Sequence, residues 1–365
     1  MPCTCEQGGE RAPERAGADD ADSHPSSVGG SGVPAGAPVG ASASTPGECP
    51  GRLLDPCPAV SLYGVNSGIL LVDKPQGITS HDVVARTRRL AGTRKIGHAG
   101  TLDPMATGLL LLGVNGATRL LHYLVGLDKE YLATIRLGWD TTTDDAEGEV
   151  LPAASADRLA AATPSVIEAG MLRQTGTIEQ VPSAVSAVKV AGKRAYQRVR
   201  DGERVELAAR IVTVTAFELL AVRRGEGCVD ADVRVECSSG TYVRALARDL
   251  GAWLGTGGHL TALRRTRIGA FRVDEAAALD DLDVAASMMS PADAARRALP
   301  VAVLTSDQAV DLGHGKRIAA SGVTDAAPGD AIAAIGPDDR LVAIVERRGD
   351  SLKVVTGFPP EGAGA

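Results

Sequence analysis

The chain has 365 residues, of which 44% are apolar and 23% charged, so it has enough apolar sequence for a real core and for two or three domains. Aromatic residues make up only 3%, so aliphatic side chains must fill that core. The formal net charge of −7 argues against a general nucleic-acid coat protein, which would be basic. That charge is unevenly spread, because residues 1–60 carry −5 and residues 273–365 carry −7, whereas residues 61–272 carry +5. The total therefore hides a block that could bind a polyanion.

Membrane and disulfide classes are disfavoured by the sequence. No run approaches the ~18 consecutive apolar residues of a transmembrane helix, and the start lacks the basic and apolar regions of a signal peptide. Six cysteines are too few for a disulfide framework, and Cys3-x-Cys5 has no partner pair at metal-finger spacing. We therefore expect a cytoplasmic protein with reduced thiols, no metal and no membrane partner.

The composition divides the chain into three regions. Residues 1–62 are rich in Gly, Ser, Pro and Ala and have hardly any branched apolar residues before Leu53, which predicts a disordered tail. Order is expected to begin near residue 63, and a change in composition near Pro300 marks a second boundary. The sequence thus predicts one larger domain at 63–299 and a small, mostly β domain at 300–365.

Hydrophobic periodicity predicts a mixture of helices and strands in the larger domain. In chain order these are a strand at 69–72, a helix capped by Thr79 or Ser80 and ended by Gly92, a helix at 117–127, a strand at 130–139, helical sequence at 153–173, a hairpin of strands at 211–220 and 228–237, and a helix at 242–254. The last region is expected to hold a helix at 307–313 and strands at 341–345 and 352–355. This mixture indicates an α+β protein with a large mixed sheet.

The densest motif is Gly-His-Ala-Gly-Thr-Leu-Asp-Pro-Met-Ala-Thr-Gly at residues 97–108. Its glycines and its proline are typical of a tight, fixed loop. Pro104 biases Asp103 toward an extended backbone, which would present the carboxylate at the end of a rigid turn. The alternative is an Asx turn with a purely structural aspartate, and spacing alone favours it. The Gly-Lys-Ser/Thr ending of a phosphate-binding Walker loop is missing.

A second motif occupies the predicted junction of a strand with a helix at residues 237–251. The strand ends at Gly240 and the helix starts at once, so Tyr242 and Arg244 lie at a strand end, where sites in α/β proteins often form. The alternative places Tyr242 in the core and leaves Arg244 solvated.

These residues belong to a series of short motifs that resembles the TruB family of pseudouridine synthases, closely over residues 66–300 and loosely beyond. The motifs are Val72-Asp-Lys-Pro-x-Gly-x-Thr-Ser80, Gly97-His-x-Gly-Thr-Leu-Asp-Pro-x-Ala-x-Gly108, Lys129-x-Tyr131, Pro182-Ser-x-x-Ser-Ala-x-Lys189, Gly240-Thr-Tyr-Val-Arg244 and Leu263-Arg-Arg-Thr266. The long N-terminal tail departs from the family pattern.

The resemblance implies a fold and an activity. The fold would be a pseudouridine-synthase-like mixed sheet with flanking helices, followed by a PUA-like RNA-binding domain. The activity would be the conversion of uridine to pseudouridine in the T-loop of tRNA, conventionally at position 55, with no cofactor. The partner would be the T-arm of tRNA, bound by a monomer that needs no protein partner.

The resemblance also implies roles for four active-site residues. Asp103 would be the nucleophile and Arg244 the arginine that pairs with it. A cation within about 4–6 Å keeps a carboxylate ionised, which agrees with that pairing. Tyr131 would stack on the target base, and Tyr242 would be a second active-site tyrosine. Two aromatic rings suit a base that has been flipped out of its stack.

Further substrate-binding residues are implied with less specific chemistry. Leu263 would line the active site, while Arg264 and Arg265 would contact the RNA backbone, although such pairs are often solvated surface. His98 would enter the T-loop, or else order its own loop by a hydrogen bond. Lys74 would support the site.

The basic stretch at 193–200 is a candidate RNA lid, with an exposed loop as the alternative. Lys189 is expected to bind substrate, and Tyr196 and Arg200 would share one face if the stretch were helical. The acidic C-terminal domain fits RNA binding less well, so Lys316-Arg317 and Arg347-Arg348 would mark any contact face there.

Two other functions remain open from the sequence. One is a protein that binds or folds tRNA and has only secondary isomerase activity, although the intact Gly-Thr-Leu-Asp-Pro loop speaks against a lost activity. The other is a guide-RNA-dependent synthase that modifies ribosomal RNA within a complex.

Overall fold

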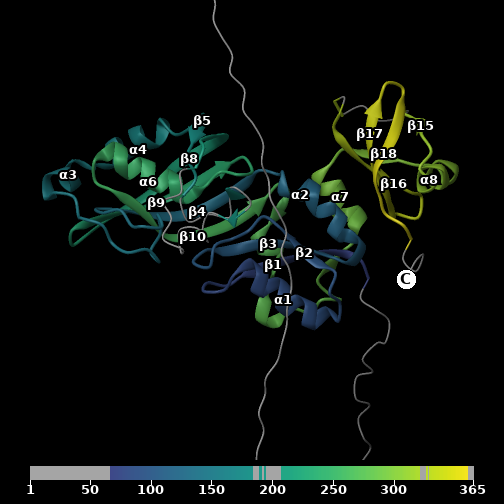
Figure 1. Cartoon of the computed structure of the whole chain (residues 1–365), viewed down its shortest axis with the longest axis horizontal. Coiled ribbons are helices and arrows are strands. Elements are labelled where there is room, and N and C mark those ends of the chain that lie inside the picture. Colours follow the sequence, from purple (N-terminus) through teal and green to yellow (C-terminus); the bar gives the residue numbers. More distant parts are fainter. Residues whose placement is uncertain are drawn as a thin grey trace, which may run out of the picture. The chain divides into compact units, whose positions relative to one another are not determined.

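A computed structural model describes residues 66–183, 207–320, 326–327 and 329–360, and the backbone of 189–190 and 193–194. A large mixed sheet with helices is followed by a separate small sheet (Figure 1). The expected α+β class with a large mixed sheet is therefore confirmed. The predicted tail at 1–62 lies outside the described residues, as do Tyr196, Arg198 and Arg200.

The large sheet has eleven strands in the hydrogen-bonded order β12-β1-β3-β10-β4-β9-β8-β5, with β13, β2 and β11 pairing beside β1, β3 and β10. Their bounds are β1 Gly68–Lys74, β2 Ile96–Ala99, β3 Thr107–Val114, β4 Lys129–Leu137, β5 Gly176–Gln180, β8 Arg210–Gly225, β9 Cys228–Cys237, β10 Gly258–Ile268, β11 Phe271–Arg272, β12 Ala277–Ala278 and β13 Met288–Met289. Strands β6 Lys189–Val190 and β7 Lys193–Arg194 pair with each other. The predicted hairpin is confirmed as β8 and β9.

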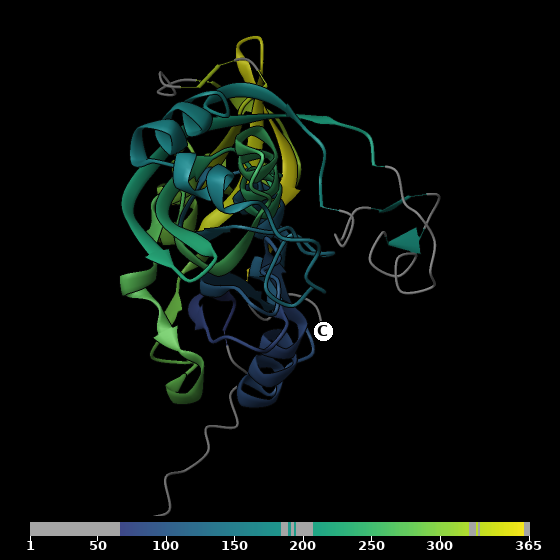
Figure 2. The ribbon, with the colours of Figure 1, turned by 90° about the vertical axis from the view of Figure 1, so that its left-hand side faces the viewer.

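The helices are α1 Ser80–Ala91, α2 Leu121–Val125, α3 Ala156–Ala161, α4 Pro164–Leu172, α6 Val243–Leu254, α7 Pro291–Ala298 and α8 Ser306–Gly313, with 3-10 helices η1 Asn115–Leu120, η2 Val273–Glu275 and η3 Leu279–Asp281. In Figures 1 and 2 the dark blue helix α1 lies well away from the teal helices α3 and α4. The helical stretch expected at 153–173 is two helices, because Pro164 has no N–H to continue α3 and instead starts α4 in its first turn. The helix expected at 117–127 is η1 followed by α2.

Helix α1 shows how local sequence sets the scaffold of the future site. Thr79 is its N-cap and forms a capping box with Asp82, while Gly92 ends it in the left-handed conformation with φ 62°. Val83 and Val84 are buried. Of the two expected capping residues, Thr79 caps, and the buried Ser80 is free to bind elsewhere.

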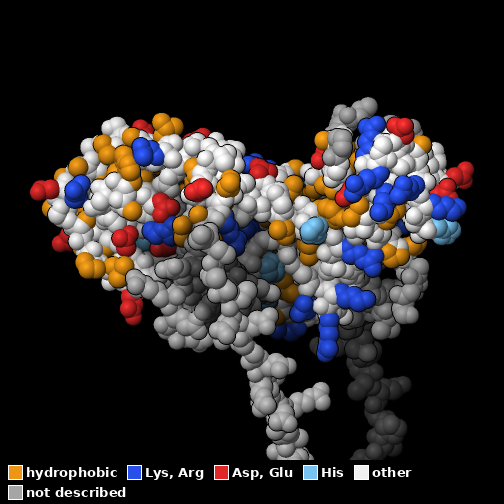
Figure 3. Space-filling view, turned by 45° about the horizontal axis from the view of Figure 1, so that its top comes forward, with side chains coloured by type: hydrophobic (Ala, Val, Ile, Leu, Met, Phe, Trp, Pro, Cys, Tyr) orange, Lys and Arg blue, Asp and Glu red, His pale blue; other side chains and the backbone are white. Residues whose placement is uncertain are grey.

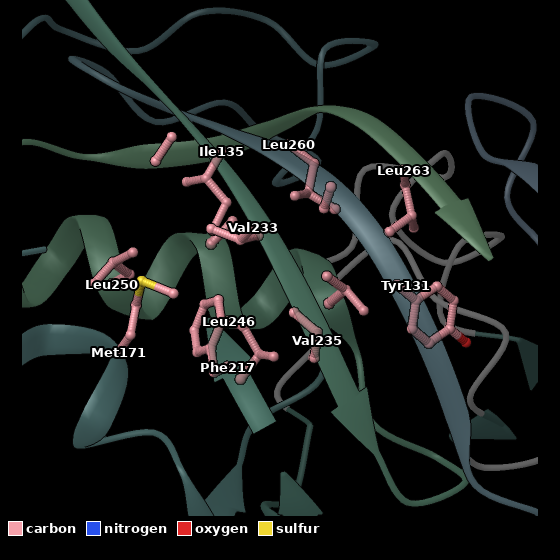
Figure 4. Close-up of a cluster of buried hydrophobic side chains, with 14 of the residues drawn as sticks. Tyr131, Ile135, Met171, Phe217, Val233, Val235, Leu246, Leu250, Leu260 and Leu263 are labelled. Carbon is pink, nitrogen blue, oxygen red and sulfur yellow. The ribbon is translucent and has the colours of Figure 1, made fainter. Parts of the chain in front are cut away.

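The core beside β4 and β10 combines side chains from several elements. Figure 4 shows Leu246 and Leu250 of α6 facing Ile135 and Val233 of the sheet, with Tyr131 at one end of this cluster. Strand β4 alternates between buried and more exposed residues, as its sequence predicts. This packing fixes α6 against the sheet, and thereby fixes the side chains at the start of α6.

The second sheet has the order β14-β16-β17-β18-β15. Its strands are β14 Val301–Val303, β15 Ile318–Ala319, β16 Ala331–Ile335, β17 Leu341–Arg348 and β18 Ser351–Gly357. A cluster that includes Leu304, Leu312, Ile332 and Val345 forms its core.

Candidate active site

Residues 100–106, called the Asp103 loop below, connect β2 to β3 and are held by the segment before α1. The buried Ser80 hydroxyl accepts a hydrogen bond from the Leu102 N–H at 2.8 Å and donates to the Leu102 carbonyl at 3.1 Å. The Pro104 carbonyl accepts from the Gly77 N–H at 2.8 Å and from Lys74 Nζ at 3.3 Å. The motif at 72–80 therefore acts as the frame of the Asp103 loop.

Arg265 of β10 holds the loop from the opposite side. Its side chain is 1% exposed, and its guanidinium donates to the Leu109 carbonyl at 2.7 Å and to the Gly100 carbonyl at 3.0 Å. The close approach of β10 to β3 requires Gly108, which has φ +101°, and a Cβ there would lie 2.2 Å from the Arg265 carbonyl oxygen. Arg265 and Gly108 together fix both ends of the segment that carries Asp103.

The carboxylate of Asp103 meets the guanidinium of Arg244, which lies in the first turn of α6. The distance from Arg244 Nη2 to Asp103 Oδ2 is 2.9 Å, and the side chains are 5% and 39% exposed, respectively. The Ala106 N–H donates to the Asp103 carbonyl at 3.1 Å, so Asp103 begins a turn, as the following proline predicts. The two strongest sequence motifs thus meet in an ion pair.

A second carboxylate, that of Asp145, binds the other side of Arg244. Arg244 Nη1 lies 3.1 Å from Asp145 Oδ2 and donates to the Thr143 carbonyl at 2.9 Å. Asp145 is buried, and its Oδ1 accepts from the Thr143 hydroxyl at 2.5 Å and from the Glu147 N–H at 3.1 Å. Asp145 was not singled out from the sequence, where the only signal was the run of acidic residues around it.

A cavity of about 260 Å³ opens beside the ion pair. It is lined by Gly100, Thr101, Leu102, Asp103, Lys129, Tyr131, Ser239, Gly240, Thr241, Tyr242, Val243, Arg244, Leu263 and Arg265. The cavity therefore brings together Asp103, Arg244, Tyr131, Tyr242, Leu263 and Arg265 from the predicted set.

The two tyrosines are positioned by the backbone around them. Tyr131 lies opposite Arg265 in the β4–β10 pairing, and burial raises the pKa of its hydroxyl, which stays protonated at neutral pH. Tyr242 is the N-cap residue of α6, and Gln180 grips its backbone by accepting from the N–H at 2.8 Å and donating to the carbonyl at 3.1 Å. Gln180 is 1% exposed and was not singled out from the sequence.

Two buried lysines lie beside the loop. Burial lowers the pKa of Lys74 and of Lys129 to about 8 in each case, and the nearby Asp103 carboxylate opposes that shift at Lys74. Lys74 Nζ donates to the Ile78 carbonyl at 2.6 Å and does not line the cavity, whereas Lys129 lines it and donates to the Val125 carbonyl at 2.6 Å. Lys129 is a cavity residue for which the sequence analysis gave no role.

Arg264 and Arg265, which were expected to contact the RNA backbone, have different surroundings. Arg265 is buried against carbonyl groups, and Arg264 makes a two-pronged ion pair with Asp73 at 3.0 and 2.7 Å. The burial of Arg265 excludes the solvated-surface alternative for that residue, and the RNA contact of both arginines stays a prediction.

Of the remaining predicted residues, His98 does not line the cavity. His98 of β2 packs its ring edge-on against His81 at 5.4 Å. Lys189 is in β6, and its side chain is outside the described residues.

Comparison with known proteins gives the family of the chain. Residues 88–243 match the N-terminal domain of the TruB family pseudouridylate synthases, and residues 244–311 match the tRNA pseudouridylate synthase B C-terminal domain. Residues 295–359 match the tRNA pseudouridine synthase II C-terminal domain. The tRNA pseudouridine synthase B of Leifsonia xyli subsp. xyli is 58% identical over 297 residues, covering 81% of this chain and 98% of that protein. This chain belongs to the TruB family. It is therefore an isomerase that forms pseudouridine.

Other TruB relatives and solved structures extend the comparison. The tRNA pseudouridine synthase B of Arthrobacter sp. (strain FB24) is 56% identical, covering 80% of this chain and 97% of that protein. A solved Cbf5-Nop10-Gar1 complex contains a chain of the same fold, with a TM-score of 0.61 and 27% identity, covering 80% of this chain and 85% of that chain. In the described part of this TruB chain, no helix has the length and apolar character needed to cross a bilayer.

Proposed function

We propose that this TruB-family isomerase acts on tRNA and converts the T-loop uridine at position 55 into pseudouridine. The observation that carries the proposal is the ion pair of Asp103 with the buried Arg244, at 2.9 Å, on the wall of a cavity that two tyrosines also line. The named relatives support tRNA as the substrate, because the match spans 97–98% of their length.

The target uridine leaves its stack and enters the cavity. The ring of Tyr131 and the side chain of Leu263 supply the apolar contacts that a base loses when it is extruded. Tyr242 lies at the same cavity, and the two hydrogen bonds from Gln180 hold its backbone. The energy of unstacking is smallest for a loop base, which favours a loop over a duplex substrate.

Asp103 then acts as the nucleophile. Overall, the bond from C1′ to N1 of the base breaks, a bond from C1′ to C5 forms, the proton on C5 leaves and N1 gains a proton. Atoms and electrons balance without an oxidant or reductant. Attack at C1′, addition to the base and a glycal route all require an ionised Asp103, and Arg244 Nη2 lies 2.9 Å from its carboxylate.

Arg244 serves two carboxylates at once. The buried Asp145 holds Nη1, while Nη2 faces the more exposed Asp103. This arrangement fixes the planar guanidinium in one orientation, so the Asp103 carboxylate is placed before substrate arrives.

The proposed enzyme works as a cytoplasmic monomer that grips the T-arm without a guide RNA or a protein partner. The chain is also similar to a chain in a Cbf5-Nop10-Gar1 complex, so the test below includes the guide-dependent alternative. The 58% identity to a tRNA pseudouridine synthase B favours the stand-alone reading over the 27% identity to the complex.

One assay separates these functions. The purified chain is incubated with a T-stem-loop that has a single uridine, at position 55, without guide RNA, and pseudouridine is mapped. Product at that position is expected, and its absence would reject the proposal. The variant Asp103→Asn addresses the RNA-folding alternative, since a protein that folds tRNA would keep its full function in this variant, whereas the proposed enzyme would still bind the RNA but form no product.

A further inference from the structure

The sequence around α1 holds an excess of positive charge that the active site does not use. Residues 83–127 contain a single carboxylate, Asp103. The same stretch contains the cations Arg86, Arg88, Arg89, Arg94, Lys95 and Arg119. A local net charge of +5 thus lies within a segment whose only acid is the catalytic one.

Among the residues that the structure describes, most of these cations have no acidic partner. Arg86 pairs with Asp280 at 2.6 Å, but Arg89, Arg94 and Lys95 form no ion pair with any residue that the structure describes, and all three are exposed. Arg88, Arg89 and Arg94 line one shallow depression at the end of α1, together with Ala85, Gly92 and Thr93. We call Arg88, Arg89, Arg94 and Lys95 the α1 basic patch.

Arginines elsewhere in the larger domain, between residues 173 and 272, behave differently. Many of them are neutralised by carboxylates across the sheet or at its ends. These pairs are Arg223 with Asp232, Arg234 with Glu130, Arg248 with Asp144, Arg264 with Asp73, and Arg267 with Asp128. Their charges are therefore less available to a polyanion than those of the α1 basic patch.

Two elements connect the patch to the Asp103 loop and set their separation. Ser80, at the start of α1, binds Leu102 of the loop, and Arg89 lies about 13 Å further along the helix axis. Strand β2 connects Lys95, the residue before it, to Gly100, the residue after it, over about 16 Å of extended chain. Both paths place the patch close enough for one bound RNA to reach it and the cavity together.

Helix electrostatics account for only part of the patch. Arg88 and Arg89 lie in the last turn of α1, where cations are favoured by the helix dipole. Arg94 and Lys95 lie beyond the Gly92 cap and gain nothing from that dipole.

Figure 3 shows Lys and Arg side chains gathered in the lower right-hand part of the face it draws, with few acidic side chains between them.

We propose that the α1 basic patch binds the phosphate backbone of the RNA that flanks the target loop. This inference rests on the proposed function, because the distance argument assumes that the target uridine is at Asp103. Guanidinium and ammonium groups without acidic partners are the groups that phosphates recruit, and each contact releases a counterion. The binding should therefore depend steeply on salt.

The test compares two triple variants of the full chain with equal changes in charge. The patch variant is Arg89→Gln/Arg94→Gln/Lys95→Gln, which avoids Arg88 because its guanidinium donates to the Ile96 carbonyl. The matched variant is Arg158→Gln/Arg173→Gln/Lys353→Gln, which removes three exposed cations that also form no ion pair with a described residue and that have no proposed RNA contact. Unchanged melting temperatures establish that both variants fold.

Affinity for the T-stem-loop is measured between 50 and 200 mM salt. For the patch variant we expect the slope of log K against log salt to become shallower by about 2, and affinity to fall at least about tenfold. In the matched variant, the slope should change by less than a third of the amount expected for the patch variant. An unchanged slope in the patch variant, or an equal change in both variants, would overturn the proposal.

Product mapping on the same RNA keeps the two proposals separate. If the wild-type chain makes pseudouridine and the patch variant binds the RNA normally, the phosphate contact is rejected and the proposed function stands. If the wild-type chain makes no pseudouridine, but the salt dependence of its RNA binding weakens in the patch variant, the proposed function is rejected and the phosphate contact stands.

Discussion

Arg244 and Asp103 form an ion pair whose two members are buried to very different degrees. The arginine side chain is 5% exposed and the aspartate 39%, across a distance of 2.9 Å. The cation is thus fixed inside the protein, whereas the carboxylate is more exposed, at the wall of the cavity. This asymmetry suits the proposed role of Asp103 as the nucleophile, since only the reacting group needs access.

Replacing Arg244 should reveal its second partner, Asp145. Arg244→Gln leaves the buried Asp145 carboxylate without its cation, so we expect a loss of about 3 kcal/mol in the free energy of unfolding. Adding Asp145→Asn should restore much of that loss, because no buried charge remains. Urea unfolding of the two single variants and the double variant measures this coupling. Strictly additive effects would contradict the shared-guanidinium arrangement.

Arg265 should behave as a support of the loop and not as a phosphate contact. A lysine at position 265 cannot bind both the Gly100 and Leu109 carbonyls. For Arg265→Lys we therefore expect the free energy of unfolding to fall by about 2 kcal/mol and the Asp103 loop to be displaced. The salt dependence of RNA binding should keep the wild-type slope. A shallower slope with unchanged stability would assign Arg265 to RNA instead.

Gly108 should tolerate no side chain. A Cβ there would lie 2.2 Å from the Arg265 carbonyl oxygen, and the backbone has φ +101°, so Gly108→Ala should cost more than about 3 kcal/mol. The control is Gly227→Ala in the β8–β9 turn, where φ is +68° and nothing lies within 4 Å of the added Cβ. That change should cost about 1 kcal/mol. Equal thermal shifts in the two variants would show that the close approach of β10 is not required.

Lys74 should make stability depend on alkaline pH. Burial lowers its pKa to about 8 in the folded chain, from 10.5 when unfolded, so the unfolded chain holds more protons between those values. Stability from this group therefore rises as pH increases from about 8 to 10.5. Wild type should gain stability relative to Lys74→Met over that window, while Lys129 and Cys237 titrate in both proteins and cancel. A pH-independent difference in unfolding free energy would contradict the assignment.

The sequence indicated the residues of the candidate site more fully than the strands and loops that position them. The residues alone indicated a tight loop around Asp103 and a strand–helix junction around Arg244, and only the family resemblance implied that the two would pair, as they do in the fold. Strand β10 was not predicted, because Arg264 and Arg265 interrupt its apolar pattern and the burial of Arg265 depends on carbonyls distant in the sequence. Asp145 was missed for the same reason, since only tertiary structure shows that its partner is Arg244.

Local signals were accurate where the chemistry is local. Thr79, Gly92 and Pro164 determine helix ends through their own backbone and side-chain preferences, and the structure has helix ends at all three. The division of 153–173 at Pro164 shows that the proline signal should have been given more weight than apolar content.

The central claim is that the Asp103 carboxylate is the nucleophile, and single-turnover kinetics test it most directly. Asp103→Asn keeps the size of the side chain and an oxygen that can accept from Arg244, but it removes the negative charge. With the T-stem-loop fully bound, we expect pseudouridine formation to fall by at least about a thousandfold, as for loss of an essential catalytic group. Binding of the RNA should change less than threefold. Turnover within tenfold of wild type would contradict the account.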